Sequence, residues 1–384
     1  MKNSNIVLTS GSLGNLRVPA QDAQQESIGQ LAISDQRISA VGSNGQWLNP
    51  INVGPLTLSD HLFTNCGATG RFGPSLEQVN AAYSGSEWVN ASSLTVSDYG
   101  VQIVTIQETG LYRIKLRGAT RSFFAAGEIE PLNVIELDVP LQAGWQLYIA
   151  VGQIGAHSQP NGAYFRCSTG SGGTFVWCPQ FSTSWPIAIA GGGGASFDGK
   201  QRVTTPAVGT ELSLVSRGSR WQDGTQYTPG GTSGQGGGVN TFGSWSTSFA
   251  GGGGGSFKGS FSKTNEDSHL KMNMCGGAII GSDNQQTSYS VVGGLIDSRY
   301  EALVKIAGGF GGGGSAILSP SGTHCVVAGG GGFAGGDASF GFGSNLCSAG
   351  RGTSFRHSSL SVVNLTFSSI TQPEHGYCRV TRIS

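Results

Sequence analysis

Only a few groups of residues have the types and spacing that chemistry requires. Residues 194–201 (GASFDGKQ) come within one residue of a phosphate-binding P-loop, but Gln201 replaces the Ser or Thr that must reach magnesium. His324 and Cys325 offer a base and a thiol, but neighbours in a strand point to opposite faces, which favours a structural role. The 22 carboxylates include no pair with the spacing of an acid and a base. We therefore expect no enzyme activity, no cofactor and no metal site.

The seven cysteines are too dispersed for a zinc site, because no C-x-x-C spacing occurs. They stand at positions 66, 167, 178, 275, 325, 347 and 378. An odd number of scattered cysteines favours reduced, buried thiols over a disulfide framework. Pairing of individual cysteines stays open as the alternative.

The charge content argues against several classes of partner. Charged residues make up 11% of the chain and the formal net charge is zero, so no long-range field attracts nucleic acid or an anionic membrane. No run of about 18 apolar residues is present, so we expect no membrane insertion. The N-terminus lacks the apolar core of a secretory signal, so we expect synthesis in a cytoplasm.

Residues 1–60 are predicted to form a small N-terminal β segment that attaches the protein or joins copies of it. Residues 30–47 (QLAISDQRISAVGSNGQW) read as a hairpin with Asn44-Gly45 as its turn and Trp47 at its end. Such short hairpin modules resemble the attachment segments of trimeric phage fibres. A small independent β element is the alternative.

One short helix is expected next, over residues 74–83. Pro74 suits a first turn, and Gly85 follows as a stop. Leu76, Val79 and Tyr83 fall on one face of this helix.

Strand patterns follow the helix. Polarity alternates in residues 112–117 and 145–151, and again only in residues 360–367 and 377–383. Strands with one apolar face are typical of a β-sandwich. We predict an all-β fold in which residues 61–187 and 353–384 form the sandwich and residues 188–352 are inserted between them.

The inserted region contains 43 of the 65 glycines. Four segments in it share an apolar approach, then an alanine (Ala190, Ala250, Ala307 or Ala328), then a glycine run. The runs contain Gly191, Gly192, Gly193, Gly194, Gly251, Gly252, Gly253, Gly254, Gly255, Gly311, Gly312, Gly313, Gly314, Gly329, Gly330, Gly331 and Gly332. The alternative, a flexible linker, would not need apolar residues before every run.

Ordering these runs requires a compensating interaction, because glycine loses more backbone entropy than any other residue. The runs have almost no side chains to bury, so only backbone N–H and C=O groups are available. In an extended helix with three residues per turn these groups point outward, where neighbouring helices can satisfy them. We predict a rigid bundle of polyglycine II helices whose connecting loops emerge at its ends.

Aromatic residues in those loops are the candidate receptor-binding residues. Their Ser, Thr and Asn neighbours suit a glycan or the loops of an outer-membrane protein. They are Phe197, Trp221, Tyr227, Trp245, Phe257, Phe261, Phe340 and Phe342. The alternative is that they cap the bundle and shield its ends from water.

Several stretches occur in the order known from one receptor family. They are residues 63–75 (FTNCGATGRFGPS), 81–85 (AAYSG), 109–114 (TGLYRI), 147–153 (LYIAVGQ), 307–314 (AGGFGGGG), 329–339 (GGGGFAGGDAS) and His375-Gly376. They resemble the glycine-rich extracellular region of the anaplastic lymphoma kinase and leukocyte tyrosine kinase receptors. This resemblance implies a jelly-roll-like sandwich that carries polyglycine helices and binds small protein ligands. The sequence shows no kinase, so receptor signalling is not implied.

A similar polyglycine bundle tips the tail fibres of some T-even-like phages, where its end loops contact host receptors. With the fibre-like residues 1–60, this favours a phage tail-fibre adhesin that is carried in the virion. The expected partners are a host outer-membrane protein or glycan, other virion tail proteins through the N-terminal segment, and further copies in a homotrimer. The alternatives are a structural fibre or cap protein and a cell-surface ligand-binding module of a cellular organism.

Overall fold

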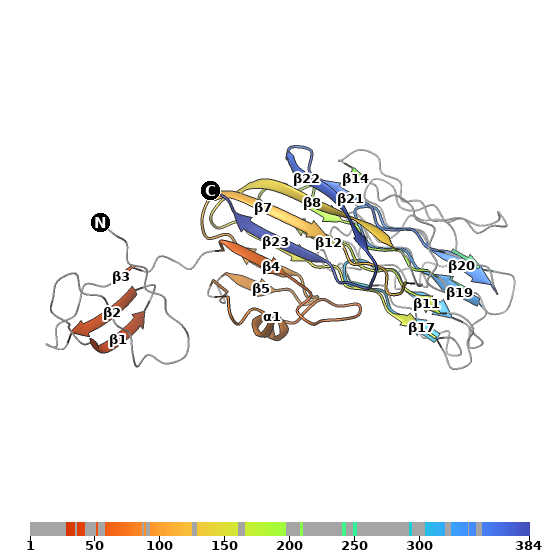
Figure 1. The fold of residues 1–384 in the computed structure, drawn as a ribbon, viewed down its shortest axis with the longest axis horizontal. Coiled ribbons are helices and arrows are strands. Elements are labelled where there is room, and N and C mark those ends of the chain that lie inside the picture. Colours follow the sequence, from red (N-terminus) through yellow and green to blue (C-terminus); the bar gives the residue numbers. More distant parts are fainter. Residues whose placement is uncertain are drawn as a thin grey trace. The chain divides into compact units, whose positions relative to one another are not determined.

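The chain divides into two units, Met1–Thr57 and Leu58–Ser384, and each is described by itself. The computed structural model describes residues 28–34, 37–42, 51–52, 58–86, 88–89, 93–124, 129–159, 166–196, 208–209, 240–242, 249–251, 292–293, 304–318, 324–336, 338–342 and 348–384 (Figure 1).

The first unit contains a three-stranded antiparallel sheet. Its order is β1 (Ile28–Ser34), β2 (Arg37–Gly42) and β3 (Ile51–Asn52). The predicted turn at Asn44-Gly45 is wrong as the turn of the first hairpin, because β1 and β2 pair as far as Ser34 opposite Arg37. Asn44 and Gly45 themselves lie outside the described residues.

Two sheets form the sandwich of the second unit. The five-stranded sheet has the order β22 (Val362–Ile370), β8 (Glu130–Leu141), β7 (Gly110–Arg117), β23 (Tyr377–Arg382) and β4 (Asp60–Phe63). The seven-stranded sheet has the order β14 (Val208–Gly209), β21 (Ser354–Arg356), β13 (Ala188–Ala190), β12 (Thr174–Trp177), β9 (Gln146–Ala150), β6 (Gln102–Thr105) and β5 (Leu94–Val96). All pairings are antiparallel except that of β14 with β21. The predicted all-β sandwich is confirmed. Strands from both ends of the unit belong to it, and so do β13 and β14, which lie within residues 188–352 that were predicted to be inserted between its strands.

Alternation along the strands places the main core between the two sheets. Tyr112, Ile114 and Leu116 of β7 are buried against Leu147 and Ile149 of β9, as the sequence predicted.

The same reasoning is wrong for β22. Val363, Leu365 and Phe367 alternate there, but their side chains are 43%, 41% and 53% exposed. β22 is an edge strand, so its alternating apolar side chains extend past the buried core.

Helix α1 (Leu76–Ala82) lies where the sequence predicted a helix, but it begins after Pro74. Ser75 is its N-cap and forms a capping box with Gln78, so the first turn is satisfied by side chains. Val79 and Tyr83 are buried. The third residue of the predicted face, Leu76, is 48% exposed because it lies in the first turn, away from the sheet that covers Val79.

Strands also occur inside the glycine-rich region, where only polyglycine helices were expected. A four-stranded antiparallel sheet contains β17 (Val304–Ile306), β18 (Ala316–Leu318), β19 (His324–Val327) and β20 (Ser339–Phe342). A further pair there is β15 (Asn240–Phe242) with β16 (Phe249–Gly251), and before the region β10 (His157–Ser158) pairs with β11 (Cys167–Ser168). The apolar approaches to the glycine runs are therefore strands, namely β13, β16, β17 and β19.

Candidate functional site

Glycine segments from distant parts of the chain pack side by side in the second unit. We call them the glycine lattice, which comprises residues 152–155, 169–173, 191–194, 308–314, 329–332 and 350–353. These residues lie outside the strands and the helix. Their N–H and C=O groups bond to one another mainly across segments, so the ladder of a sheet is replaced by a network; within segment 308–314, Gly313 N also donates to Gly309 O (2.9 Å).

Hydrogen bonds in the lattice repeat every three residues. In segment 169–173, four successive N–H groups reach three neighbouring segments, and the first and fourth reach the same one. The bonds run from Gly170 N to Gly314 O (3.1 Å), Ser171 N to Gly193 O (3.0 Å), Gly172 N to Gln153 O (2.9 Å) and Gly173 N to Gly311 O (2.9 Å). A backbone whose N–H groups rotate by a third of a turn per residue produces this pattern.

The same period occurs at two other places. At the first place, Gly330 N donates to Gly350 O (2.9 Å) and Phe333 N donates to Thr353 O (2.8 Å). At the second, Gly192 N donates to Gly331 O (2.8 Å) and Ala195 N donates to Ala328 O (3.0 Å). In each pair, residues i and i+3 donate to one neighbouring segment. Segments 191–194 and 329–332 therefore have the same three-residue hydrogen-bonding period as segment 169–173.

Lack of space, more than backbone conformation, requires glycine in most of the lattice. A Cβ atom on Gly172 would overlap the carbonyl oxygen of Phe310, and one on Gly192 would overlap the carbonyls of Ser171 and Gly172. Among the lattice glycines that the structure describes, only Gly311 and Gly312 have a positive φ (94° and 83°). Elsewhere, L-residues are excluded by neighbouring backbones that lie too close for a side chain.

Hydroxyl side chains complete the network at its margins. Ser354 Oγ accepts from Gly191 N (3.0 Å), and Ser171 Oγ accepts from Gly155 N (2.9 Å). Thr174 Oγ1 accepts from Gly152 N and donates to Arg117 O (2.7 Å). These side chains satisfy N–H groups where no backbone neighbour is available, which keeps buried donors paired.

A buried ionic group lies against the run at residues 191–194. Glu130 is fully buried, and its carboxylate accepts from the Arg121 backbone N–H (2.8 Å) and lies 3.6 Å from Arg351 Nε. Burial lowers the pKa of Arg351, and Glu130 opposes this effect. A Cβ on Gly193 would meet Glu130 Oε1, so the carboxylate packs directly on the lattice.

Two phenylalanines fix the lattice to the seven-stranded sheet. Phe310 interrupts one glycine run and Phe333 follows another, and both are fully buried with Phe175 and Phe355. The Phe333 and Phe355 rings stack with centroids 4.3 Å apart. This second core lies on the sheet face opposite the main core, because Phe175 and Ile189 alternate with main-core residues of β12 and β13.

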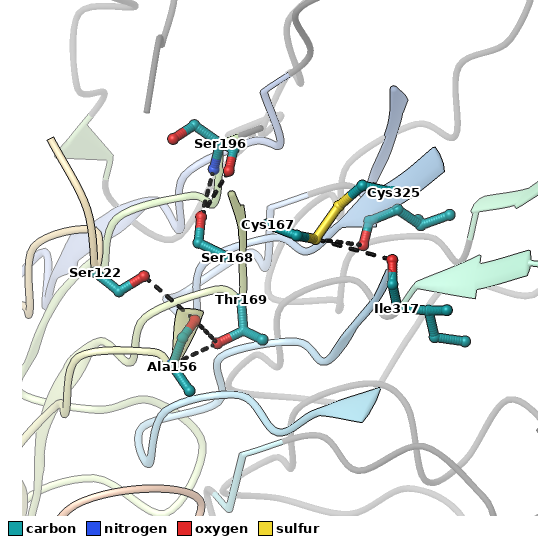
Figure 2. The surroundings of a disulfide bond; sticks show 9 residues. Ser122, Ala156, Cys167, Ser168, Thr169, Ser196, Ile317 and Cys325 are labelled. Atoms are coloured by element: carbon teal, nitrogen blue, oxygen red, sulfur yellow. Dashed lines mark hydrogen bonds between the residues drawn. A yellow bond between two sulfur atoms is a disulfide. The ribbon is translucent and has the colours of Figure 1, made fainter. Parts of the chain in front are cut away.

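A disulfide between Cys167 and Cys325 connects β11 to β19 (Figure 2). The prediction of reduced thiols is wrong for this pair, although Cys66, Cys178 and Cys378 are free thiols. The partners are 158 residues apart, so no local spacing could signal the bond. Because Cys325 is disulfide-bonded, the structural role predicted for it is confirmed.

Hydrogen bonds beside the disulfide hold the end of the run at residues 191–194. Ser168 Oγ donates to Ser196 O (2.8 Å) and accepts from Ser196 N (2.9 Å). Figure 2 shows this reciprocal pair next to Cys167. It also shows the next residue, Thr169, whose hydroxyl accepts a hydrogen bond from Ala156 N. The covalent bond and the reciprocal pair therefore act on adjacent residues of one segment.

Sequence reasoning found four glycine runs but missed segments 152–155, 169–173 and 350–353. The structure brings the described runs 191–194, 311–314 and 329–332 together with them. In the fourth run, residues 251–255, the structure describes only Gly251, which lies in β16. The missed segments contain single glycines or pairs of glycines. Only residues 168–173 (STGSGG) have a glycine content that could have predicted a lattice segment.

Of the eight candidate binding residues, six lie outside the described residues and two lie in a strand. Phe197, Trp221, Tyr227, Trp245, Phe257 and Phe261 lie outside the described residues. Phe340 and Phe342 belong to β20, opposite Val326 and His324, so their assignment to a loop is wrong. Alternation in Ser339-Phe-Gly-Phe342 favours a strand, and β19 offers the pairing edge.

Two searches cover the described part of the chain. No helix there is long and apolar enough to cross a membrane. In the same residues, no group of three or more His, Cys, Asp or Glu side chains could hold a metal ion.

Comparison with known proteins yields a partial match. No protein-family model matches the chain. Over 104 residues, or 27% of its length, the chain is 34% identical to the leukocyte tyrosine kinase receptor of Mus musculus, and it spans 12% of the receptor's length. The chain is thus similar, over about a quarter of its own length, to a segment of a leukocyte tyrosine kinase receptor.

Proposed function

We propose that this protein is a non-catalytic adhesin whose glycine lattice holds receptor-binding loops in fixed positions outside a cell. The observation that carries the proposal is the hydrogen bonding of period three between glycine segments. A surface that is held by backbone contacts on all sides loses little entropy when it binds, because its support is already ordered. Recognition chemistry then varies in the connecting loops.

The lattice segments other than 308–314 are proposed to be polyglycine II helices, since segment 308–314 contains a turn that the bond from Gly313 N to Gly309 O closes. Bonds from residues i and i+3 to one neighbour support this, because such a helix has three residues per turn and bonds only to its neighbours. The close approach at Gly172 and Gly192 supports it as well. Slow amide exchange at residues 170–173, 191–194 and 330–332 is expected, and rapid exchange throughout them would contradict a rigid lattice.

The setting proposed for this adhesin is a bacteriophage tail-fibre tip. Residues 1–57, with their three-stranded sheet, would attach the tip to other virion tail proteins, and a homotrimer would fit a fibre. The host receptor would be an outer-membrane protein or a glycan. The protein would be synthesised in the host cytoplasm and carried in the virion.

A second candidate is a cell-surface ligand-binding module of a cellular organism. Two observations favour it. The chain matches a segment of a receptor over 104 residues, and it contains a buried disulfide, a bond that persists mainly in oxidising compartments.

Adsorption competition tests the proposed adhesin. The purified full-length protein should bind intact host cells and reduce phage adsorption at saturating dose. Trp245→Ala and Phe257→Ala should weaken this competition, because aromatic residues supply much of the binding energy at interfaces. The matched control is Phe72→Ala, an aromatic that is 48% exposed beside α1 and should leave competition unchanged.

Each outcome separates the candidates. Cell binding that survives both loop substitutions would contradict the assigned binding residues, whereas a protein that neither binds host cells nor competes with phage adsorption would favour a structural fibre or cap protein. No binding to host cells, together with binding to a secreted protein ligand, would replace the phage adhesin by the cellular module.

A further inference from the structure

A three-residue loop, residues 374–376, leads into β23 and connects it to the glycine lattice. Gly376 N donates to Gly152 O (2.9 Å), and His375 Nδ1 accepts from Ile154 N (3.2 Å). Two successive residues of the loop therefore bond to one lattice segment, residues 152–155. The imidazole ring is half-buried at this junction.

The hydrogen bond to His375 differs in kind from the others in segment 152–155. The remaining three N–H groups of this segment donate to two hydroxyls and one backbone carbonyl, and these acceptors do not titrate between pH 4 and pH 8. They are Thr174 Oγ1, Phe310 O and Ser171 Oγ. Ile154 N instead donates to an imidazole, which can gain a proton in this range.

The direction of this bond fixes the state of the ring. A ring nitrogen accepts a hydrogen bond only when it carries no proton, so His375 must be neutral, with its proton on Nε2. Protonation would add a hydrogen to Nδ1, and two N–H donors would then face each other. The contact between His375 and Ile154 cannot survive that change.

The charged groups around the loop offset each other. Arg117 Nη2 of β7 donates to His375 O (3.0 Å) and pairs with the Glu374 carboxylate (2.7 Å), and the guanidinium lies over the Tyr377 ring. Segment 152–155 contains no titratable side chain. Burial lowers the pKa of His375 from its usual 6.5, so the bond is present at neutral pH.

We propose that His375 is an acid-sensitive clamp, which holds lattice segment 152–155 to the start of β23 at neutral pH and releases it when the ring gains a proton. The release is local, because Glu374 N and O remain bonded to Thr120 Oγ1 and N (2.8 and 2.9 Å). Acid would thus loosen the lattice where it meets the sandwich and leave the loop attached to β7. This inference does not depend on the proposed adhesin function.

Hydrogen exchange of the full-length protein at pH 7.5 and pH 5.5 tests the proposal. Each rate is divided by the intrinsic rate at the same pH, because exchange itself depends on pH. Protection of residues 153–155 should fall by roughly threefold to tenfold. Tenfold is the upper limit, because pH 5.5 lies one unit below 6.5, the usual pKa of a solvent-exposed imidazole.

Residues 134–137 of β8 are the internal reference, since they lie in the centre of the sandwich. Their protection should fall less than that of residues 153–155, because the clamp acts on the lattice segment. An equal fall at both places would indicate unfolding of the whole unit and would overturn the proposal. So would unchanged protection of residues 153–155.

Two substitutions separate titration from packing. His375→Asn keeps an acceptor near the position of Nδ1 but does not titrate, so protection of residues 153–155 should be equal at both pH values. His375→Phe keeps a ring without an acceptor, so protection should be low at both. The matched control His61→Phe removes a buried histidine of β4 and should retain the fall. A fall that persists in His375→Asn would show that another group is responsible.

Nuclear magnetic resonance of the wild type gives a measurement that does not depend on the folding of any variant. The histidines are labelled with ¹⁵N, and at pH 7.5 the ring of His375 should have an unprotonated Nδ1 and a protonated Nε2. Its titration should coincide with the loss of protection at residues 153–155. A ring that carries its proton on Nδ1 at pH 7.5, or one that titrates without any change in protection, would overturn the proposal.

Discussion

Individual glycines in the lattice take the place that large apolar side chains occupy in an ordinary core. Gly172→Ala should lower the free energy of unfolding by about 3 kcal/mol, because its Cβ would overlap the Phe310 carbonyl and force backbones apart. Gly85→Ala is the matched control, since a Cβ there meets nothing within 4 Å. It should be neutral or add roughly 0.5 kcal/mol. Urea unfolding of both variants checks this, and equal losses would contradict the packing argument.

His61 gives the sandwich an acid-sensitive position. Its ring is packed edge-on by Phe63, Tyr83 and Trp88, with centroids 4.7, 4.4 and 5.0 Å away. Burial lowers the pKa of His61 from 6.5 to about 4, although the nearby Asp60 carboxylate opposes this. Between these two values the unfolded chain binds a proton that the folded chain does not. Stability should therefore fall as the pH decreases from about 6.5 to about 4 and become level below that, by roughly 1–3 kcal/mol from this residue.

Urea unfolding at pH 7 and pH 5 measures this effect. The variant His61→Phe keeps an aromatic ring but cannot be protonated, so the decrease between the two pH values should be smaller than in the wild type. Burial also lowers the pKa of His375, so this residue contributes to the decrease in the same direction. The difference between wild type and variant isolates His61, and an identical pH dependence would show that His61 is not the group responsible.

Among the elements, β23 is the one on which the sandwich depends most. It hydrogen-bonds β7 on one side and β4 on the other, and its Cys378 and Val380 are fully buried. Deletion of residues 373–384 should abolish cooperative thermal unfolding. Without β23, strands β7 and β4 would lose their hydrogen-bonding partner and part of the hydrophobic core would be exposed to solvent. Arg379→Ala is the control, since its ion pair with Asp60 is exposed to solvent and should contribute little to stability. A soluble, cooperative truncated protein would contradict this role.

The elements also show where sequence reasoning works and where it ends. Alternation identified β7, β9 and β23, because each strand has one face in the core. The edge strand β22 alternates in the same way and is exposed, since pattern alone does not reveal whether a second sheet lies opposite. Segment 169–173 carried no side-chain signal at all, because its contacts are made by the backbone. Neither the partners of a strand nor the Cys167–Cys325 bond could be derived, since both depend on residues far apart in the chain.

At the scale of the whole molecule, the Cys167–Cys325 bond makes the lattice depend on its redox environment. The bond closes a loop of 158 residues that contains β12, β13 and three of the lattice segments. Closing a loop of this size in the unfolded chain should stabilise the fold by roughly 2–5 kcal/mol. The double variant Cys167→Ser with Cys325→Ser should therefore lower the thermal midpoint, and Cys66→Ser, which removes a free thiol, should not.

The redox state of this bond can be measured directly. Both sulfurs are fully buried, so the bond should resist dithiothreitol in the folded protein and be reduced only when the lattice opens. Protein made in a reducing cytoplasm would then start as the weaker, dithiol form and gain the bond after release, whereas a secreted module would have it from the first folding. Thiol titration of freshly isolated protein under denaturing conditions should therefore find Cys167 and Cys325 oxidised in extracellular material. Free thiols at both positions in that material would remove the disulfide as an argument for the cellular ligand-binding module.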